Sequence, residues 1–214
     1  MITTPQLISL LATSAKPVRR LRPPLLRATC WLLLATLVFA LLAVGHGVRQ
    51  DFAQRVAQPI FVIGLASSLV TGVLAAIAAF FISLPDRSRA WGLLPVPALL
   101  VWVSTVSYGC VTHWVDIGPD GMRIGETARC FATLILTSLP LSLGLFLMLR
   151  HAAWLLPTAV TLTGGLAVAA MTASALSLFH EFDATVMVLM WNLGVAAMIV
   201  GIGYVLGLRA RAVS

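Results

Sequence analysis

The chain has 214 residues, of which 60% are hydrophobic and only 10% charged, and its net charge is +7. Soluble domains are about 45–50% apolar and about 25% charged, so this composition excludes a soluble globular protein and predicts an integral membrane protein. The basic residues lie mostly at the ends of apolar segments. Membrane orientation and contact with anionic membrane lipid explain them there, so no nucleic-acid partner is expected.

The first predicted element is a short amphipathic helix over residues 1–14. Thr4 suits the N-cap and Pro5 suits the first helical position. The apolar residues recur at helical spacing and are Leu7, Ile8, Leu10 and Leu11. A helix of about ten residues is unstable alone in water. It is therefore expected to be disordered, to lie on the membrane, or to fold against a partner.

A basic block, residues 16–27, follows this helix and contains no acid. The next stretch, residues 28–44, carries no charge at all. Lys and Arg beside a crossing helix stay on the cytoplasmic side, so residues 1–27 are expected in the cytoplasm. No cleavable signal peptide is expected at the start of the chain, because residues 1–15 lack the positive region that precedes the apolar one in such peptides.

Six apolar segments come next, each without Asp, Glu, Lys or Arg and each long enough for the ~20 residues of a crossing helix. They are 28–48, 59–84, 91–110, 130–149, 153–179 and 184–207. The expected fold is an all-α integral membrane protein with six transmembrane helices. The expected parts are a cytoplasmic N-terminal segment, 1–27, a transmembrane domain, 28–208, and a cytoplasmic tail, 209–214.

The distribution of charge supports this topology. The segments expected inside hold 10 of the 14 basic residues, and six of the seven acids fall outside. The Lys and Arg bias alone predicts that both termini are cytoplasmic, N-in and C-in. Two features predict packing: Gly64, Ser68 and Gly72 are spaced by four, which lets helices approach closely, and Pro140 should kink its helix.

The sequence offers little sign of catalysis or transport. No ionisable acid or base lies in the middle of any predicted span, whereas proton relays and ion pathways need such groups at depth. The motifs of zinc proteases, serine hydrolases and phosphate-binding loops are also absent from the sequence. We therefore expect no enzyme, no catalytic residue and no cofactor, and an intramembrane hydrolase or transporter is disfavoured.

Three cysteines leave several interpretations open. Cys110 ends the third predicted helix and Cys130 begins the fourth, both on the outer side, whereas Cys30 is near the inner face. If those two helices are neighbours, Cys110 and Cys130 could reach disulfide range, about 5.5–6 Å between Cα atoms. The cysteines could instead be apolar filler at helix ends or redox-sensing thiols. A tetrahedral metal site is a weaker alternative, formed by Cys110, His113, Cys130 and His180.

Several short stretches in combination resemble one known family. They are Leu7-Ile8, Pro17-Val18-Arg19-Arg20-Leu21, Cys130 after the Gly-Pro-Asp-Gly turn at 118–121, Ser138-Leu139-Pro140, Gly164-Gly165-Leu166, Leu178-Phe179-His180 and Trp191. This set resembles the NrsF family of membrane-bound anti-sigma factors over nearly the whole chain. The resemblance implies a six-helix protein of the bacterial inner membrane that regulates transcription in a stress response.

The resemblance also implies a partner and candidate sites. Members of the family hold an extracytoplasmic-function sigma factor through the cytoplasmic N-terminus, and outer cysteines take part in sensing oxidative or metal stress. The implied sigma-binding residues are Leu7, Ile8, Leu11, Val18, Arg19 and Arg20. The implied sensor is Cys130. The second sensor cysteine of the family stands here as His180, and Cys110 is its candidate substitute.

Two rival functions come from other classes. A small membrane transporter or cofactor-binding membrane subunit would show flux or a bound chromophore, and a purely structural scaffold would leave transcription unchanged when deleted. The sequence leaves the oligomeric state, the inducing signal and the identity of the sigma factor open.

Overall fold

The computed structural model describes residues 3–14, 22–113, 124–149, 157–179 and Gly194. Every regular element in these residues is helical, which confirms the all-α class. The elements are α1 (Thr4–Ser14), α2 (Pro24–His46), α3 (Phe52–Val56), α4 (Pro59–Ile82), the 3₁₀ helix η1 (Arg89–Leu93), α5 (Val96–His113), α6 (Ile124–Leu149) and α7 (Pro157–Phe179). Five stretches of the described chain are long and apolar enough to cross a membrane. Apart from Gly194, the sixth predicted span, 184–207, lies outside the described residues.

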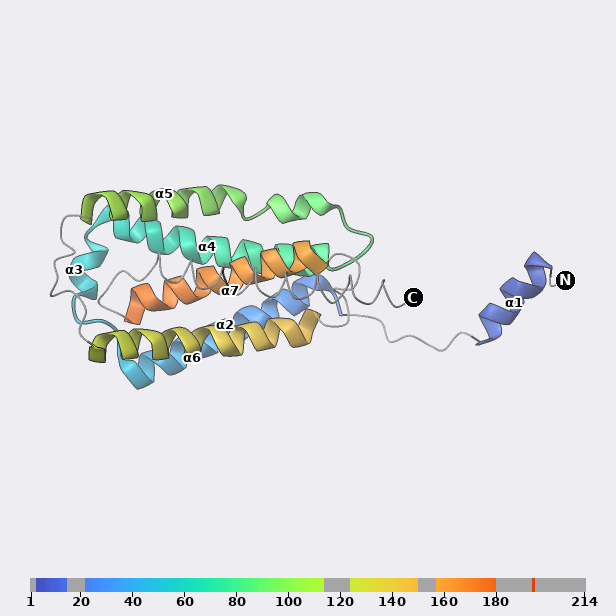
Figure 1. Ribbon diagram of the computed structural model, residues 1–214, viewed down its shortest axis with the longest axis horizontal. Helices are drawn as coiled ribbons and strands as arrows, with labels where there is room; N and C mark the ends of the chain where they lie inside the picture. Colours follow the sequence, from blue (N-terminus) through green and yellow to red (C-terminus); the bar gives the residue numbers. More distant parts are fainter. Residues whose placement is uncertain (1–2, 15–21, 114–123, 150–156, 180–193, 195–214) are drawn as a thin grey trace.

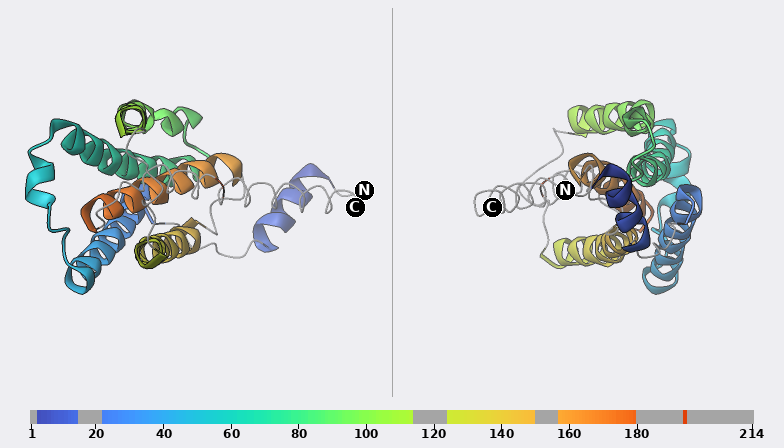
Figure 2. Two further views of the ribbon diagram at one scale, coloured as in Figure 1. Left: turned by 60° about the vertical axis from the view of Figure 1, so that its left-hand side comes forward. Right: turned by 90° about the vertical axis from the view of Figure 1, so that its right-hand side faces the viewer.

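Helices α4 and α7 form the centre of the bundle (Figures 1 and 2). Helix α5 packs on α4, α6 packs on α7, and α2 contacts both α4 and α6. Burial is greatest in α7, where 61% of the span is buried inside the protein, and least in the span that contains α5, where 11% is buried. The short helix α3 lies at one end of the bundle, and α1 stands apart from the bundle beyond the other end (Figure 1).

Small side chains allow the central pair to pack closely. Gly72 faces Met171 of α7, and a Cβ at this glycine would lie only 3.0 Å from the Met171 Cε. Four residues earlier, the hydroxyl of Ser68 forms a hydrogen bond of 2.8 Å with that of Ser174. The spacing of small residues on this helix therefore predicted a real interface, because interhelical packing in a membrane depends on close backbone approach.

The outer faces of the bundle are strongly apolar. On α2 the exposed side chains include Leu33, Leu37, Leu41 and Val44, which follow one another at helical spacing. A continuous apolar stripe of this kind is costly in water but suits the acyl chains of a bilayer. Together with the five long apolar helices, it makes the fold compatible with a membrane protein.

Three helix ends differ from those expected. Helix α2 begins at Pro24 and not at 28, so the basic residue Arg27 lies within the helix. Helix α6 begins at Ile124, six residues before the expected start, which puts Cys130 in its second turn. Helix α1 begins at Thr4, and the side chain of Gln6 accepts a hydrogen bond of 3.1 Å from the Thr3 amide, so the cap is one residue earlier than predicted.

The third apolar segment is also not a single regular helix. It consists of η1 and then α5, separated at Leu94 and Pro95. Pro95 and Pro97 have no N–H to donate to the carbonyl four residues before, so a continuous α-helix cannot be completed across this stretch. The Leu94 amide instead donates to the carbonyl of Trp91, three residues earlier, at 3.1 Å.

Candidate functional site

Helix α1 presents the sequence-predicted binding residues to solvent. Leu7, Ile8 and Leu10 are 47%, 63% and 58% exposed. The hydroxyl of Ser9 donates to the Gln6 carbonyl at 3.0 Å, on the side of the helix that is away from these apolar residues. The described part of the chain thus contains an amphipathic helix that leaves its apolar side chains uncovered. Leu11 lies in α1, but its side chain is outside the described part, as are Val18, Arg19 and Arg20.

Two ends of the bundle each contain one buried arginine. The start of α2 and the last turns of α4 and α6 form one end of the bundle, named here the Arg27 end. The Arg49 end gathers the end of α2 with α3 and the last turn of α7. Arg27 and Arg49 are each only 6% exposed, and they are the buried charged residues of the described chain. No pattern in the sequence identifies either as buried, because membrane orientation and loop charge account equally well for basic residues at these positions.

At the Arg27 end, the guanidinium of Arg27 connects three helices. Its Nη2 donates a hydrogen bond to the Met148 carbonyl near the end of α6. Its Cζ lies 5.1 Å from the ring centroid of Phe80 on α4, which is within the range of a cation–π contact. Its buried Nη1 has no hydrogen-bond partner among the described residues. The side chain therefore fixes the first turn of α2 to the bundle, at the end of the basic block.

A second cation and an aromatic pair lie beside this arginine. Phe81 follows Phe80 on α4, and its ring stacks on Trp91 with centroids 4.4 Å apart. The Arg87 guanidinium lies 5.7 Å from the Phe81 centroid. Arg27, the last residue of the basic block, and the loop after α4 therefore lie at one end of the bundle. The assignment of that end to the cytoplasm, and with it the N-in and C-in topology, stays a prediction.

At the Arg49 end, a buried arginine closes the last turn of α7. Gly47, with φ +74°, turns the chain after α2 in a conformation that suits glycine. The Arg49 amide then donates to the Leu178 carbonyl at 3.3 Å, and its Nη1 donates to the Ser177 carbonyl at 3.4 Å. A cation at a helix C-terminus satisfies free carbonyls and complements the helix dipole. The same guanidinium binds Asp51 through two hydrogen bonds of 2.6 and 2.8 Å.

This pairing changes the acidity of Asp51. The hydrogen bonds from Arg49 lower the pKa of the Asp51 carboxyl to about 2, from an ordinary value of 3.8. Because the pKa is lower in the folded state, the pair stabilises the fold fully above about pH 4, and this contribution is lost as the pH falls towards 2. The ion pair that holds Arg49 against the last turn of α7 is therefore stable to mild acid.

Replacing Asp51 with Asn tests this ion pair. We expect Asp51→Asn to lower the Tm at neutral pH, because it removes the Asp51 carboxylate that forms two hydrogen bonds with the buried Arg49 guanidinium. The variant should also lose the part of the pH dependence of Tm between pH 4 and 2 that Asp51 causes. Thermal unfolding in detergent micelles measures both effects. Asp86→Asn is the control, because the Asp86–Arg87 pair is long, 3.8 Å, and exposed. Equal Tm values for the two variants at neutral pH would contradict the structural role of Asp51.

The helices bring most of the sensor candidates towards the Arg49 end. Cys110 lies in the last turn of α5, which ends at His113, and Cys130 lies near the start of α6. The side chains of these three residues and the whole of His180 are outside the described part of the chain. Cys30 belongs to the first turns of α2, near the Arg27 end, and its thiol is free and exposed.

Helices α5 and α6 lie on opposite sides of the bundle (Figure 2), so they do not form the packed pair on which disulfide formation between Cys110 and Cys130 depends. That pairing stays a prediction. Among the side chains that the structure describes, no three His, Cys, Asp or Glu residues gather into a metal site. The candidate ligands Cys110, His113, Cys130 and His180 are not among those side chains, so the metal site also stays untested.

These features define a helical bundle, in which five helices are long and apolar enough to span a membrane, with a separate amphipathic helix at its N-terminus. No curated protein and no solved structure matches the chain significantly. A family model described as NrsF, negative regulator of sigma F, matches residues 11–211, which is nearly the whole chain. The chain belongs to this family, which confirms the resemblance seen in the sequence. The family description indicates a regulatory protein whose partner is a sigma factor. The match begins after Leu7 and Ile8, so the family model does not cover them. Their candidacy as binding residues is supported by their exposure on α1.

Proposed function

We propose that this protein is an anti-sigma factor that sequesters an extracytoplasmic-function sigma factor at the bacterial inner membrane. The N-terminal segment, α1 with residues 15–21, holds the sigma factor in the cytoplasm, and the bundle anchors it. An oxidative or metal stress in the envelope then releases it. The family membership supports the class of partner, and the structure of α1 supports the place of binding.

The exposed apolar side of α1 is the observation that carries this proposal. Full burial of a Leu or Ile side chain contributes about 1.5–3 kcal/mol, so Leu7, Ile8 and Leu10 together offer a substantial gain that the free helix does not use. A helix of 11 residues is marginal alone in water, and a groove on a partner would stabilise it. Arg19 and Arg20 extend the same segment and are proposed as polar contacts.

The proposed signal enters at the Arg49 end. Cys130, with Cys110 or His180, is the proposed sensor, because α6, α5 and α7 carry these positions towards the same end of the bundle. A modification there can release the sigma factor only if it stabilises the releasing conformation of the bundle more than the holding one. Membrane transport is the rival function. It has less support, because the buried charges of the described residues, Arg27 and Arg49, lie at the ends of the bundle and not in the middle of the spans.

Removal of the N-terminal segment tests the tether directly. A protein that lacks residues 2–15 should keep its place in the membrane but fail to retain the sigma factor in a pull-down from solubilised membranes. The full-length chain, with the same affinity tag at its C-terminus, is the control. Unchanged retention of the sigma factor by the shortened protein would refute the tether. Its absence from the membrane fraction would instead show that residues 2–15 are needed for assembly.

A further inference from the structure

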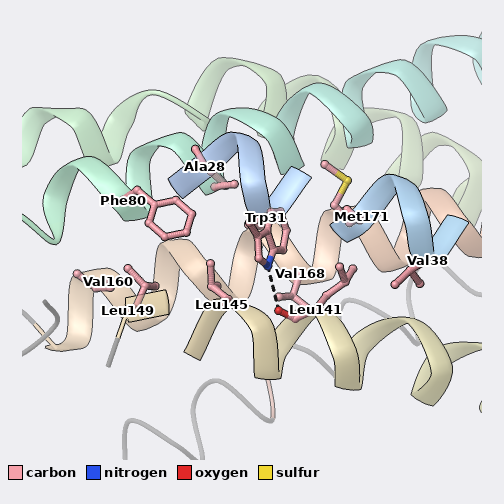
Figure 3. Packing of buried hydrophobic residues seen from close by; sticks show 14 of the residues in the cluster. Ala28, Trp31, Val38, Phe80, Leu141, Leu145, Leu149, Val160, Val168 and Met171 are labelled. Atoms are coloured by element: carbon pink, nitrogen blue, oxygen red, sulfur yellow. Dashed lines mark hydrogen bonds between the residues drawn. The ribbon is translucent and has the colours of Figure 1, made fainter. Parts of the chain in front are cut away.

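Helix α2 holds α6 by two hydrogen bonds to backbone carbonyls. The indole Nε1 of Trp31 donates to the Leu141 carbonyl at 3.0 Å, as the dashed line in Figure 3 shows. One turn earlier on α2, the Arg27 guanidinium donates to the Met148 carbonyl. Trp31 is fully buried and Arg27 is 6% exposed. Arg27 and Trp31 are four residues apart on α2, and the residues whose carbonyls they bind are seven apart on α6. Each spacing places both residues on one face of their helix.

The two bound carbonyls belong to one half of α6. Pro140 lies inside this helix, directly before Leu141. A proline has no N–H for the carbonyl four residues before it, so the helix is weakest and most easily bent at this point. The half that follows, 141–149, is attached to α2 near both of its ends. The half that precedes, 124–139, carries Cys130.

Close packing reinforces the contact of α2 with α6 in the stretch that lies between the two bound carbonyls. Gly144 faces Leu34 of α2, and a Cβ at this glycine would lie only 2.6 Å from the Leu34 Cδ2. Leu141 and Leu145 are buried beside it in the core that also contains Trp31 (Figure 3). Residues 141–149 of α6 therefore move together with the start of α2 unless the hydrogen bonds and this packing are broken.

One of the two attachments leaves a polar group unsatisfied. Among the residues that the structure describes, the buried Nη1 of Arg27 has no hydrogen-bond partner. A buried donor without an acceptor is costly, so a rearrangement that brings this nitrogen to an acceptor or to water would recover free energy. The Arg27 contact is therefore the less firmly held of the two attachments.

We infer that Trp31 and Arg27 are positioning residues that couple α6 to the N-terminal tether, so that a change at Cys130 bends α6 at Pro140 and moves the start of α2. This inference rests on the proposed function and adds the route by which the sensor reaches the sigma-binding helix. Helix α6 is the direct link between sensor and tether. Its residues 124–139 carry Cys130, and its residues 141–149 are bound to Arg27, which follows the tether.

The decisive variant removes one hydrogen bond and little else. Trp31→Phe keeps an aromatic ring in the core but loses the indole N–H. We expect normal retention of the sigma factor in resting cells, because α1 and the tether are intact. Release by hydrogen peroxide or Cd²⁺, measured with a sigma-dependent reporter, should be about threefold to tenfold smaller, which is the effect of one hydrogen bond on an equilibrium constant.

The matched control is Trp102→Phe. Trp102 is also buried, at 2% exposure, and belongs to a second core cluster with Leu134 of α6 and Ala170 of α7, so its replacement leaves the hydrogen bonds from α2 to α6 in place. This variant loses the same volume and should keep the full release response. Membrane levels and the Tm of the two variants are measured together. An equal response to the inducer in both would overturn the coupling.

A second pair of variants gives an independent test by packing. Gly144→Val places a branched side chain against Leu34 and should separate α2 from α6, which weakens the same response. Gly45→Val is the control, because no heavy atom lies within 4 Å of a Cβ at Gly45. Reduced release in Gly144→Val alone supports the coupling, and equal release in both variants overturns it. If Trp31→Phe is missing from the membrane, this pair decides the question.

The outcomes separate this inference from the proposed function. If deletion of residues 2–15 leaves retention unchanged, or if neither hydrogen peroxide nor Cd²⁺ releases the sigma factor from the natural protein, the proposed function fails and the coupling with it. If deletion abolishes retention and the natural protein responds, but Trp31→Phe and Gly144→Val respond like their controls, only the coupling is wrong.

Discussion

The double substitution Leu7→Asp with Ile8→Asp is expected to weaken binding of the sigma factor about a hundredfold, because the two side chains together lose about 3 kcal/mol of apolar burial. Both residues are exposed on α1, so the charges cost little in the free protein. Titration of the purified sigma factor against the full chain in detergent or nanodiscs measures the Kd. In cells, the same variant should raise sigma-dependent transcription without a signal.

A charge on the opposite face of the same helix is the control. Ser9→Asp places one carboxylate next to Ile8 in the sequence, but on the polar side of α1, where the Ser9 hydroxyl donates to the Gln6 carbonyl. We expect its Kd to stay within about threefold of the natural value, as is usual for exposed polar substitutions. Equal losses for the two faces would show that charge, and not the apolar face, governs binding.

Replacement of Cys130 with Ser is expected to abolish release of the sigma factor by hydrogen peroxide or Cd²⁺. Serine is nearly the same size as cysteine but forms neither a disulfide nor a thiolate for a soft metal. Resting retention should be unchanged, because Cys130 is near the start of α6 and α1 is far along the chain. The readout is the ratio of reporter transcription with and without the inducer.

The other two cysteines distinguish the forms of the sensor. Cys30→Ser should keep full induction, because Cys30 lies at the Arg27 end and its exposed thiol is free. Loss of induction in Cys110→Ser as well as in Cys130→Ser would support a sensor that uses both thiols. Full induction in Cys130→Ser would remove this residue from the mechanism.

Much of the fold followed from local patterns. Length and hydropathy predicted the long apolar helices, and the five that the structure describes are confirmed. The spacing of Gly64, Ser68 and Gly72 predicted close helix packing, because only small residues allow it. The structure shows how this stripe divides: Gly64 faces Thr105 of α5, whereas Gly72 faces Met171 of α7. Spacing shows that a helix is approached closely but does not identify its neighbour.

Helix ends were predicted less well. The predicted spans end at charged residues, so the prediction has Arg27 outside the first helix and Arg129 outside the fourth. Both are helical in the structure. A charged residue at a helix end can remain in the helix if its head group reaches a carbonyl, an aromatic ring or water. Hydropathy has no information about such partners, which is why it shortens helices at their charged ends.

Local sequence patterns are enough to indicate a helical protein, apolar enough for a membrane, that belongs to its family and has an amphipathic N-terminal helix. They do not identify the basic residues that hold the bundle together. Arg27 was one of five in a basic block, and Arg49 was one of four in the loops expected outside. Their partners, Met148 and Ser177, are 121 and 128 residues away. A hydrogen bond between such distant residues depends on how the helices pack, and no local pattern in the chain encodes it.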